Sequence, residues 1–324
     1  MLEIFGTIGP ACSDRDTLAA MITEGMTGIR LNCSHAGLQE SREMLMHLRQ
    51  AEAETGKKVD LMIDLQGPET RIGVLKEPLF LSRGEIIPAE MLCLSDAVSA
   101  ALMPEDRILL DDGKILAEMT DENHMQIIRG GMLQSRKSIK IEGRTIDTPI
   151  LTEQDLRNIS LIREYGVTSV MQPFVHSGSD LRRVRSVLKE HGCGDVRLFA
   201  KIETEEGASD IASIIPECDT VVIARGDLGN CMPLWKLPAV QKEISHACLQ
   251  QNRPFMVVTQ MLTSMIDSPV PTRAEVSDIF NAAVDGASSV MVTNETAVGK
   301  YPAEVIHYLS MTACEGFHYR KKCL

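Results

Sequence analysis

The sequence predicts a (β/α)8 barrel with a small β domain inserted after the third strand. Short aliphatic runs alternate with helix-length stretches along most of the chain, and this rhythm is interrupted once, over residues 74–137. Alternating strands and helices are typical of a parallel sheet covered by helices, and 324 residues suffice for a barrel and a small domain. A doubly wound sheet is the alternative, but TIGPA after the first run poorly matches a glycine-rich phosphate loop.

Composition limits the function classes. The chain is 44% hydrophobic and 24% charged, with a formal net charge of −12, so nucleic acid is not an expected partner. Apolar runs fall well short of the roughly 20 residues of a membrane helix, and the first residues do not resemble a signal peptide. Nine cysteines without a CxxC pair predict reduced thiols. We therefore expect a cytoplasmic protein without a membrane partner.

The first three strands are expected within residues 1–73. The run 3–8 is stopped by Gly9-Pro10, 26–31 forms the second strand, and 59–63 forms the third. Each is followed by a charged or polar position or a turn signal, as expected of buried parallel strands.

The helical period disappears in the second part, residues 74–137. Turn signals separate short β-like runs there, and RILLDDGKILAEM predicts a hairpin around Asp112-Gly113. A domain of this size has a thin core, so we expect it to act as a mobile lid.

The barrel rhythm resumes in residues 138–324. The five remaining strands are expected at 167–172, 196–203, 220–227, 255–260 and 287–295. Pairs resembling helix-capping boxes support the intervening helices, and the same pattern marks the first helix. These pairs are Ser13 with Asp16, Thr152 with Asp155, and Thr272 with Glu275.

Polar residues follow the predicted strands and would converge on one rim, because a barrel carries its active site at the C-terminal ends of its strands. They are Arg30, Asn32, Ser34, Asp64, Lys201, Glu203, Asp227, Thr259 and Glu295. Glu203 and Asp227 from adjacent strands can share one hard cation, and Lys201 adds a fixed positive charge. This combination suits a phosphate-bearing or enolate-forming anion. Glu295 is equally compatible with a structural anchor.

Motifs in order along nearly the whole chain resemble the pyruvate kinase family. They are TIGPA (7–11), RLNCSH (30–35), IDLQGPETR (63–71), DDG (111–113), FVHSGSD (174–180), KIE (201–203), ARGDLG (224–229) and the long block 259–302. The resemblance implies a glycolytic transferase that converts phosphoenolpyruvate and ADP to pyruvate and ATP through a Mg-bound enolate.

The resemblance also implies roles at the acidic and basic rim residues. Glu203 and Asp227 would bind Mg²⁺ or Mn²⁺, and Arg30 and Lys201 would contact the transferring phosphoryl group. Lys201 would then stabilise the enolate. The Gly226-Asp227 turn would receive the substrate carboxylate at a helix N-terminus. Thr259 would lie near the proton delivered to the enolate carbon.

Two further sets of residues are implied by the resemblance. Asn32, Ser34, Asp64 and Leu65 match the family's K⁺ site. The nucleotide side would comprise His35, Arg71, Asp112 and Lys137, of which Lys137 is the weakest match because GVNLPG is replaced by SIKIEG.

Departures from the family leave alternatives open. Leu65-Gln66 and Ile72 resemble the K⁺-independent branch, whereas Glu69 is the K⁺-dependent residue, so K⁺ dependence is undecided. Substitutions at Pro173, His176, Thr293, Asn294 and Val298 could reshape the substrate pocket. The alternatives are a divergent paralogue acting on another 2-keto acid or phosphate ester, and a non-catalytic ligand-binding regulator. The family's C-terminal domain is expected to be absent, and a homodimer through the barrel is expected.

Overall fold

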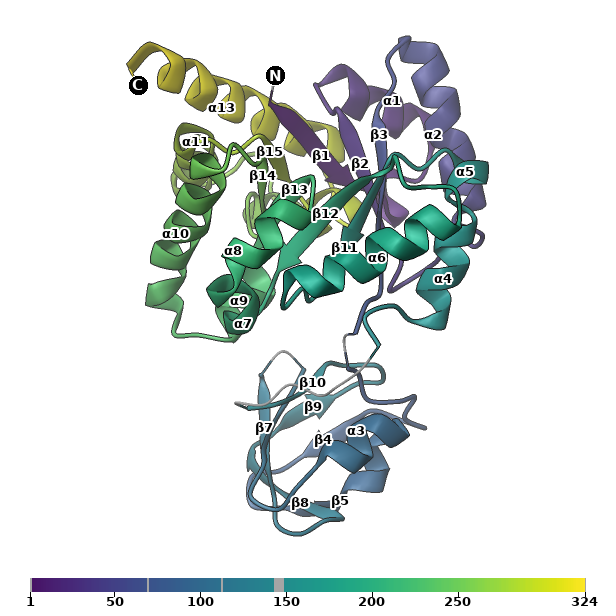
Figure 1. Ribbon diagram of the computed structural model, residues 1–324, viewed down its shortest axis with the longest axis vertical. Coiled ribbons are helices and arrows are strands. Elements are labelled where there is room, and N and C mark those ends of the chain that lie inside the picture. Colours follow the sequence, from purple (N-terminus) through teal and green to yellow (C-terminus); the bar gives the residue numbers. More distant parts are fainter. Residues whose placement is uncertain (1, 69, 112, 143–148, 324) are drawn as a thin grey trace. The chain divides into compact units, whose positions relative to one another are not determined.

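The structure, a computed structural model, describes residues 2–68, 70–111, 113–142 and 149–323. The chain forms two compact units, residues 1–67 with 150–324 and residues 68–149. The larger unit contains a closed barrel of parallel strands in the order β1-β15-β14-β13-β12-β11-β3-β2, which confirms the predicted fold class (Figure 1). The strands are β1 (Glu3–Thr7), β2 (Gly28–Asn32), β3 (Asp60–Asp64), β11 (Ser169–Gln172), β12 (Arg197–Ile202), β13 (Thr220–Ala224), β14 (Phe255–Val258) and β15 (Ser289–Met291).

Helices surround these strands (Figure 1). The α-helices of the larger unit are α1 (Arg15–Thr23), α2 (Arg42–Thr55), α4 (Glu153–Ser160), α5 (Ile162–Tyr165), α6 (Gly178–Glu190), α7 (Glu205–Ser209), α8 (Ile211–Ile214), α9 (Arg225–Asn230), α10 (Leu237–Gln250), α11 (Arg273–Asp285), α12 (Asn294–Ala297) and α13 (Pro302–Cys323). Short 3-10 turns are η1 (Pro10–Cys12), η3 (Ile215–Glu217), η4 (Leu234–Lys236) and η5 (Thr263–Ile266). Among the described residues, no helix is both long enough and apolar enough to cross a bilayer.

Helix caps follow the sequence at two of the three predicted pairs. Thr152 and Thr272 each accept a bond from the backbone N–H three residues later, and the acid at that position bonds back to the cap. The prediction for the first helix was wrong by one residue. Asp14 is its N-cap and accepts from the Thr17 N–H at 2.9 Å, because its carboxylate reaches the first turn directly.

The barrel interior is filled by side chains from alternate positions of the strands. Phe5 and Phe199 meet edge to face with centroids 6.3 Å apart, and methionines from four strands fill the remaining space. Gly28 of β2 lies under Phe5, and a Cβ on Gly28 would come within 2.2 Å of the Phe5 ring. The missing side chain of Gly28 therefore makes room for the largest group in the interior.

The smaller unit contains two antiparallel sheets. One has the order β10-β6-β7-β8-β5 and the other pairs β4 with β9. Its elements are β4 (Leu79–Leu81), β5 (Ile86–Pro88), η2 (Ala89–Leu92), α3 (Asp96–Ala101), β6 (Arg107–Leu110), β7 (Ile115–Met119), β8 (His124–Arg129), β9 (Gly131–Leu133) and β10 (Ile139–Ile141). Antiparallel β6 and β7 form the predicted hairpin, whose Asp112 lies outside the described residues.

The smaller unit is wider than the predicted range 74–137. Ile139–Ile141 was assigned to the barrel, but it forms β10 and pairs with β6. Arg71 also belongs to this unit, since it bridges to Ser138. Three residues are too few to reveal from sequence which sheet they join, so the boundary was misplaced.

Candidate active site

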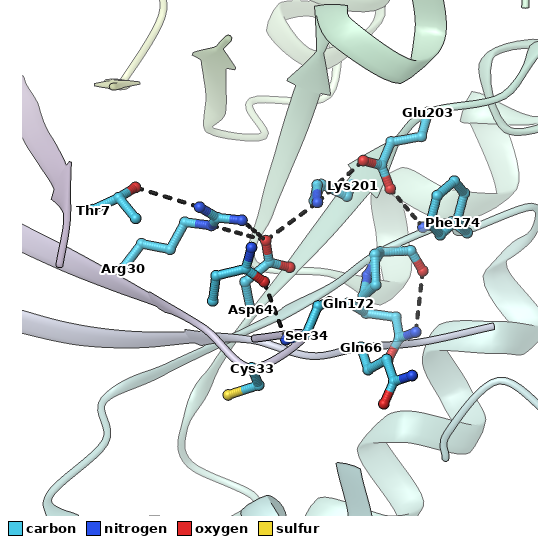
Figure 2. Close-up of polar contacts among 12 residues, drawn as sticks. Thr7, Arg30, Cys33, Ser34, Asp64, Gln66, Gln172, Phe174, Lys201 and Glu203 are labelled. Carbon is cyan, nitrogen blue, oxygen red and sulfur yellow. Dashed lines mark hydrogen bonds and ion pairs between the residues drawn. The ribbon is translucent and has the colours of Figure 1, made fainter. Parts of the chain in front are cut away.

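Side chains from three barrel strands form a continuous polar chain at the C-terminal rim (Figure 2). Arg30 lies on β2, Asp64 ends β3, and Lys201 lies on β12, with Glu203 one residue beyond that strand's end. The register pairs Arg30 with Met62 and Asn32 with Asp64. Alternate side chains of each strand point into the barrel, so Arg30 and Asp64 point toward the same interior space at its C-terminal end. The structure thus brings together four residues predicted from sequence.

Asp64 is the acceptor at the centre of this chain. Its Oδ2 accepts from Arg30 Nη2 at 2.6 Å and Nε at 2.8 Å, and from Lys201 Nζ at 3.2 Å. Arg30 Nη1 also reaches Thr7 Oγ1 at 3.4 Å. The side chain of Asp64 is 2% exposed, so two cations compensate a carboxylate that is almost entirely removed from water.

Lys201 connects Asp64 to Glu203. Its Nζ lies 3.1 Å from Glu203 Oε1, and Glu203 Oε2 accepts the Phe174 N–H at 2.9 Å. Phe174 has φ +50°, a left-handed conformation uncommon for a non-glycine residue, which turns its N–H toward the carboxylate. Glu203 is therefore fixed on both oxygens.

Burial and neighbouring charge shift the pKa values of these groups in different directions. Burial alone would raise the pKa of Asp64, but Lys201 and Arg30 outweigh it and hold that pKa below the ordinary value. Burial raises the pKa of Glu203 to about 7, against the opposing effect of Lys201 and with an added contribution from the Asp227 carboxylate. Burial would lower the pKa of Lys201, but Asp64 and Glu203 outweigh it and raise that pKa.

The donor set fits a divalent cation. Two cationic side chains, Arg30 and Lys201, face three carboxylates, Asp64, Glu203 and Asp227, which leaves one excess negative charge. Burial raises the pKa of Glu203 despite the ion pair with Lys201, and carboxylate oxygens are the ligands that Mg²⁺ prefers. Within the described residues, His, Cys, Asp and Glu do not gather in metal-binding groups of three, so substrate and water oxygens would complete the shell.

A second feature fits a monovalent cation. Asp64 Oδ1 is buried, and no hydrogen-bond donor in the described part of the chain reaches it. In the loop after β2, Asn32 Oδ1 accepts the Ser34 N–H at 3.2 Å. The Cys33 N–H bonds to the Asp64 carbonyl at 2.9 Å, which ties this loop to the end of β3. The Leu65 N–H donates to the Met171 carbonyl at 3.0 Å and its side chain is buried. A buried oxygen that receives no hydrogen bond can instead be satisfied by a bound cation.

Thr259 and Gly226 meet at the ends of the neighbouring strands β14 and β13. Thr259 Oγ1 accepts the Gly226 N–H at 2.8 Å and donates to the Val258 carbonyl at 2.6 Å. Thr259 has φ +74°, which for a β-branched residue is strained by about 1–3 kcal/mol. Thr259 thus contacts the first turn of α9, and the surrounding contacts hold a strained backbone.

Two residues that hold this turn were not assigned from the sequence. Arg225 donates to the Thr259 carbonyl and forms an ion pair with Asp278 of α11 at 2.7 Å. Arg225 is visible in the sequence only as a charge after a strand, and Asp278 lies 53 positions away on a helix. Only the fold brings them together.

Glu295 lies among backbone donors. Its Oε1 accepts the Leu262 N–H at 3.3 Å and its Oε2 accepts the Thr293 N–H at 2.7 Å and the Thr293 hydroxyl at 3.2 Å. The residue is buried at 2% exposure. These contacts favour the anchoring role, because both oxygens are used to tie the loop after β15 to the loop after β14.

The residues of the expected nucleotide side are divided between the two units. His35 is an exposed residue of the larger unit, whereas Arg71 and Lys137 belong to the smaller one. Arg71 Nη1 donates to the Arg136 carbonyl at 2.8 Å, and Lys137 Nζ lies 2.9 Å from Asp111 Oδ1. Asp112 lies outside the described residues, as does Glu69.

The substituted positions differ in burial. Pro173 is buried, and His176 and Thr293 are partly exposed. His176 N–H donates to Asp180 Oδ2 at 2.9 Å, so the residue just before the N-cap is tied to the first turn of α6. Asn294 and Val298 are exposed.

Fold and site together define a (β/α)8 barrel with paired carboxylates and buried cationic side chains at the C-terminal strand ends. Comparison with known proteins identifies the class more closely. A family model described as "Pyruvate kinase, barrel domain" matches residues 1–306. The chain belongs to the pyruvate kinase family, and its relatives place it with the pyruvate kinase-type phosphotransferases.

Three relatives illustrate the similarity. A pyruvate kinase of Aeropyrum pernix is 35% identical over 98% of this chain and 71% of its own length. A pyruvate kinase of Bacillus licheniformis is 33% identical over 98% of this chain and 58% of its own length. One of Mycobacterium intracellulare is 34% identical over 96% of this chain and 69% of its own length. This chain thus spans only part of the length of each relative.

Proposed function

We propose that this chain transfers the phosphoryl group of phosphoenolpyruvate to ADP, giving pyruvate and ATP. An ADP oxygen forms the new bond to phosphorus as the bond from phosphorus to the enol oxygen breaks. The enolate left behind then takes a proton at its methylene carbon. The observation that carries the proposal is the buried chain Arg30–Asp64–Lys201–Glu203, in a chain whose relatives are named pyruvate kinases.

Arg30 and Lys201 supply the positive charge that phosphoryl transfer requires. Both are held in place by Asp64, which removes the entropy cost of ordering them when the substrate binds. As the bond to phosphorus breaks, charge develops on the enol oxygen, and Lys201 stabilises it in a site with little water.

Glu203 and Asp227 would hold Mg²⁺ or Mn²⁺. When bound, the metal neutralises charge on the substrate. The two cationic side chains and three carboxylates of the site sum to −1 when all are ionised, and with the metal added the total is +1. A positive site of this size suits a substrate that carries both a phosphate and a carboxylate. The third carboxylate, Asp64, is already occupied by Arg30 and Lys201 and would remain outside the divalent shell.

The substrate carboxylate would compete with Thr259. Gly226 N–H is bonded to Thr259 Oγ1, so a carboxylate arriving at the start of α9 would displace that hydroxyl. The released hydroxyl would then be available near the enolate carbon, where it would order the water that delivers the proton. Carboxylate binding and preparation of the proton donor would thus occur together.

The test is coupled release of pyruvate from phosphoenolpyruvate, ADP and Mg²⁺, with purified Lys201→Met as the matched control. The expected result is metal-dependent turnover that the variant loses. Turnover no higher than that of the variant, in a folded wild-type protein, would refute the proposal.

A second candidate is metal-assisted enolisation of another 2-keto acid. It is favoured by one observation: all residues of the enolate side lie in the larger unit, whereas Arg71 and Lys137 lie in the smaller one. Methyl-proton exchange of pyruvate and related keto acids in D₂O, followed by NMR, tests it. Faster exchange with another keto acid than with pyruvate, without ATP formation, would favour this candidate over the first.

A further inference from the structure

The turn after β14 is strained at two successive residues. Thr259 has φ +74° and Gln260 has φ +54°, and neither is glycine. Left-handed conformations at β-branched residues persist only where surrounding contacts fix them. The contact that fixes this turn should therefore matter for the position of Thr259.

Arg225 makes that contact. Its Nη2 and Nε donate to the Thr259 carbonyl at 2.6 and 3.2 Å, and Nη2 also lies 2.9 Å from Met261 Sδ. On the other side, Nη1 donates to both oxygens of Asp278, at 2.9 and 2.7 Å. The guanidinium, whose side chain is 11% exposed, thus joins the start of α9, the turn after β14 and helix α11.

The two polar groups of Thr259 are held by different partners. Its hydroxyl accepts the Gly226 N–H, whereas its carbonyl accepts Arg225. When a substrate carboxylate takes the Gly226 N–H, the hydroxyl loses one partner but the carbonyl does not. The backbone of Thr259 would then stay in its left-handed conformation while its side chain changes partner.

We propose that Arg225 is a positioning residue for the enolate-protonation step, and that Asp278 orients its guanidinium. The proposal rests on the proposed function of the site. Arg225 acts through Thr259 and does not itself contact the substrate. Loss of Arg225 should therefore slow proton delivery more than it weakens substrate binding.

Two variants and a chemical rescue test this. Arg225→Ala should lower kcat by about 100-fold, the effect of displacing a group by roughly 1 Å, while KM for phosphoenolpyruvate changes by less than about threefold. Arg225→Lys should retain part of the rate, because an ammonium can reach Asp278 but cannot copy the planar fork. Added guanidinium at low millimolar concentration should partly restore Arg225→Ala.

A matched control is Arg185→Ala. Arg185 also joins a carboxylate and a carbonyl, Asp219 Oδ2 at 2.6 Å and the Val196 carbonyl at 2.9 Å, but it lies at the opposite ends of the strands. It should lose stability without a selective loss of kcat and without rescue by guanidinium. Equal effects of both variants on kcat, or KM rising as much as kcat falls in Arg225→Ala, would overturn the proposal.

Failure of the proposed function gives a different pattern. If the wild type makes no ATP but exchanges pyruvate methyl protons, the same variants are compared on exchange, where Arg225→Ala should be slower by about 100-fold. If the wild type does neither, a crystal structure of Arg225→Ala decides. A Thr259 φ that stays positive there would overturn the role of Arg225, and a φ that becomes negative would support it.

Discussion

Lys201 Nζ lies 3.1 Å from Glu203 Oε1, and both side chains are almost completely buried. A lysine placed between two carboxylates, Asp64 and Glu203, stays ionised, because their charges outweigh its burial. The same lysine is thus both the partner of Glu203, the proposed metal ligand, and a positive charge available to the proposed substrate anion.

Replacement of Lys201 by Met should reduce turnover by at least about 100-fold, because a preorganised charge at the developing enolate is lost. Steady-state kinetics at saturating Mg²⁺ measures this. Lys242→Met is the control, since Lys242 is exposed and pairs with Asp285 on the outer helices. Retention of a large part of the activity in Lys201→Met would contradict its role.

Mn²⁺ binding should depend on pH through Glu203. Its pKa is raised from 4.5 to about 7, so the metal-free folded protein keeps a proton there between those values. Raising the pH through this window destabilises the metal-free fold, because ionisation of the buried carboxyl is unfavourable. Metal binding must displace the proton, so apparent affinity should fall by up to about tenfold per unit below pH 7.

Titration calorimetry of Mn²⁺ between pH 6 and 8 checks this prediction. Asp64 contributes in the opposite direction, because its pKa is lowered: its stabilisation is lost only as the pH falls below the ordinary Asp range. The pH ranges in which Glu203 and Asp64 affect the stability of the fold are therefore separate. An affinity that is constant across the measured range would contradict the raised pKa of Glu203, and Glu203→Gln should remove the pH dependence together with most of the binding.

K⁺ should stimulate turnover, since Asp64 Oδ1 is buried with no donor from the described residues. Assays at constant ionic strength, with KCl exchanged for tetramethylammonium chloride, test this prediction. Tetramethylammonium is too large to enter a buried site, so it supplies ionic strength alone. Equal rates in both salts would indicate that Arg30 and Lys201 already satisfy Asp64.

Glu295→Gln should destabilise the fold by about 1–3 kcal/mol, because one amide cannot accept from both Leu262 and Thr293 without turning a donor toward a buried N–H. Urea unfolding with and without Mn²⁺ measures the change. Glu304→Gln is the control at an exposed helical position. A variant as stable as the wild type would exclude Glu295 as the anchor of the two loops.

The barrel could be predicted from sequence because the buried strands contain short apolar runs, such as Phe255–Val258, that alternate with helix-length stretches carrying an apolar stripe. The convergence of Arg30, Asp64, Lys201 and Glu203 could be predicted because all C-terminal strand ends share one rim. Their partners could not be predicted in the same way. The bond of Glu203 to Phe174 depends on a left-handed backbone, and the pairing of Arg225 with Asp278 depends on the packing of α11.

The boundary of the smaller unit was harder to predict from the sequence than these side-chain partners. Leu65 and Gln66 continue directly from β3, and the Gln66 and Gly67 N–H groups bond to Asp155 across the insertion, at 2.7 and 3.0 Å. These bonds fix the last residue of the larger unit, but they join positions 88 and 89 residues apart. Local propensity carries no information over that separation.

The neighbours β3 and β11 are joined in the barrel although the insertion separates them, with Asp64 beside Met171. During synthesis, β3 therefore remains an open sheet edge until about a hundred further residues have been made. Loop-closure entropy grows only slowly with length, so the delay is mainly one of time. Exposed edges are sites of misassembly, and the interval before β11 arrives is the period in which the nascent chain would gain most from a chaperone.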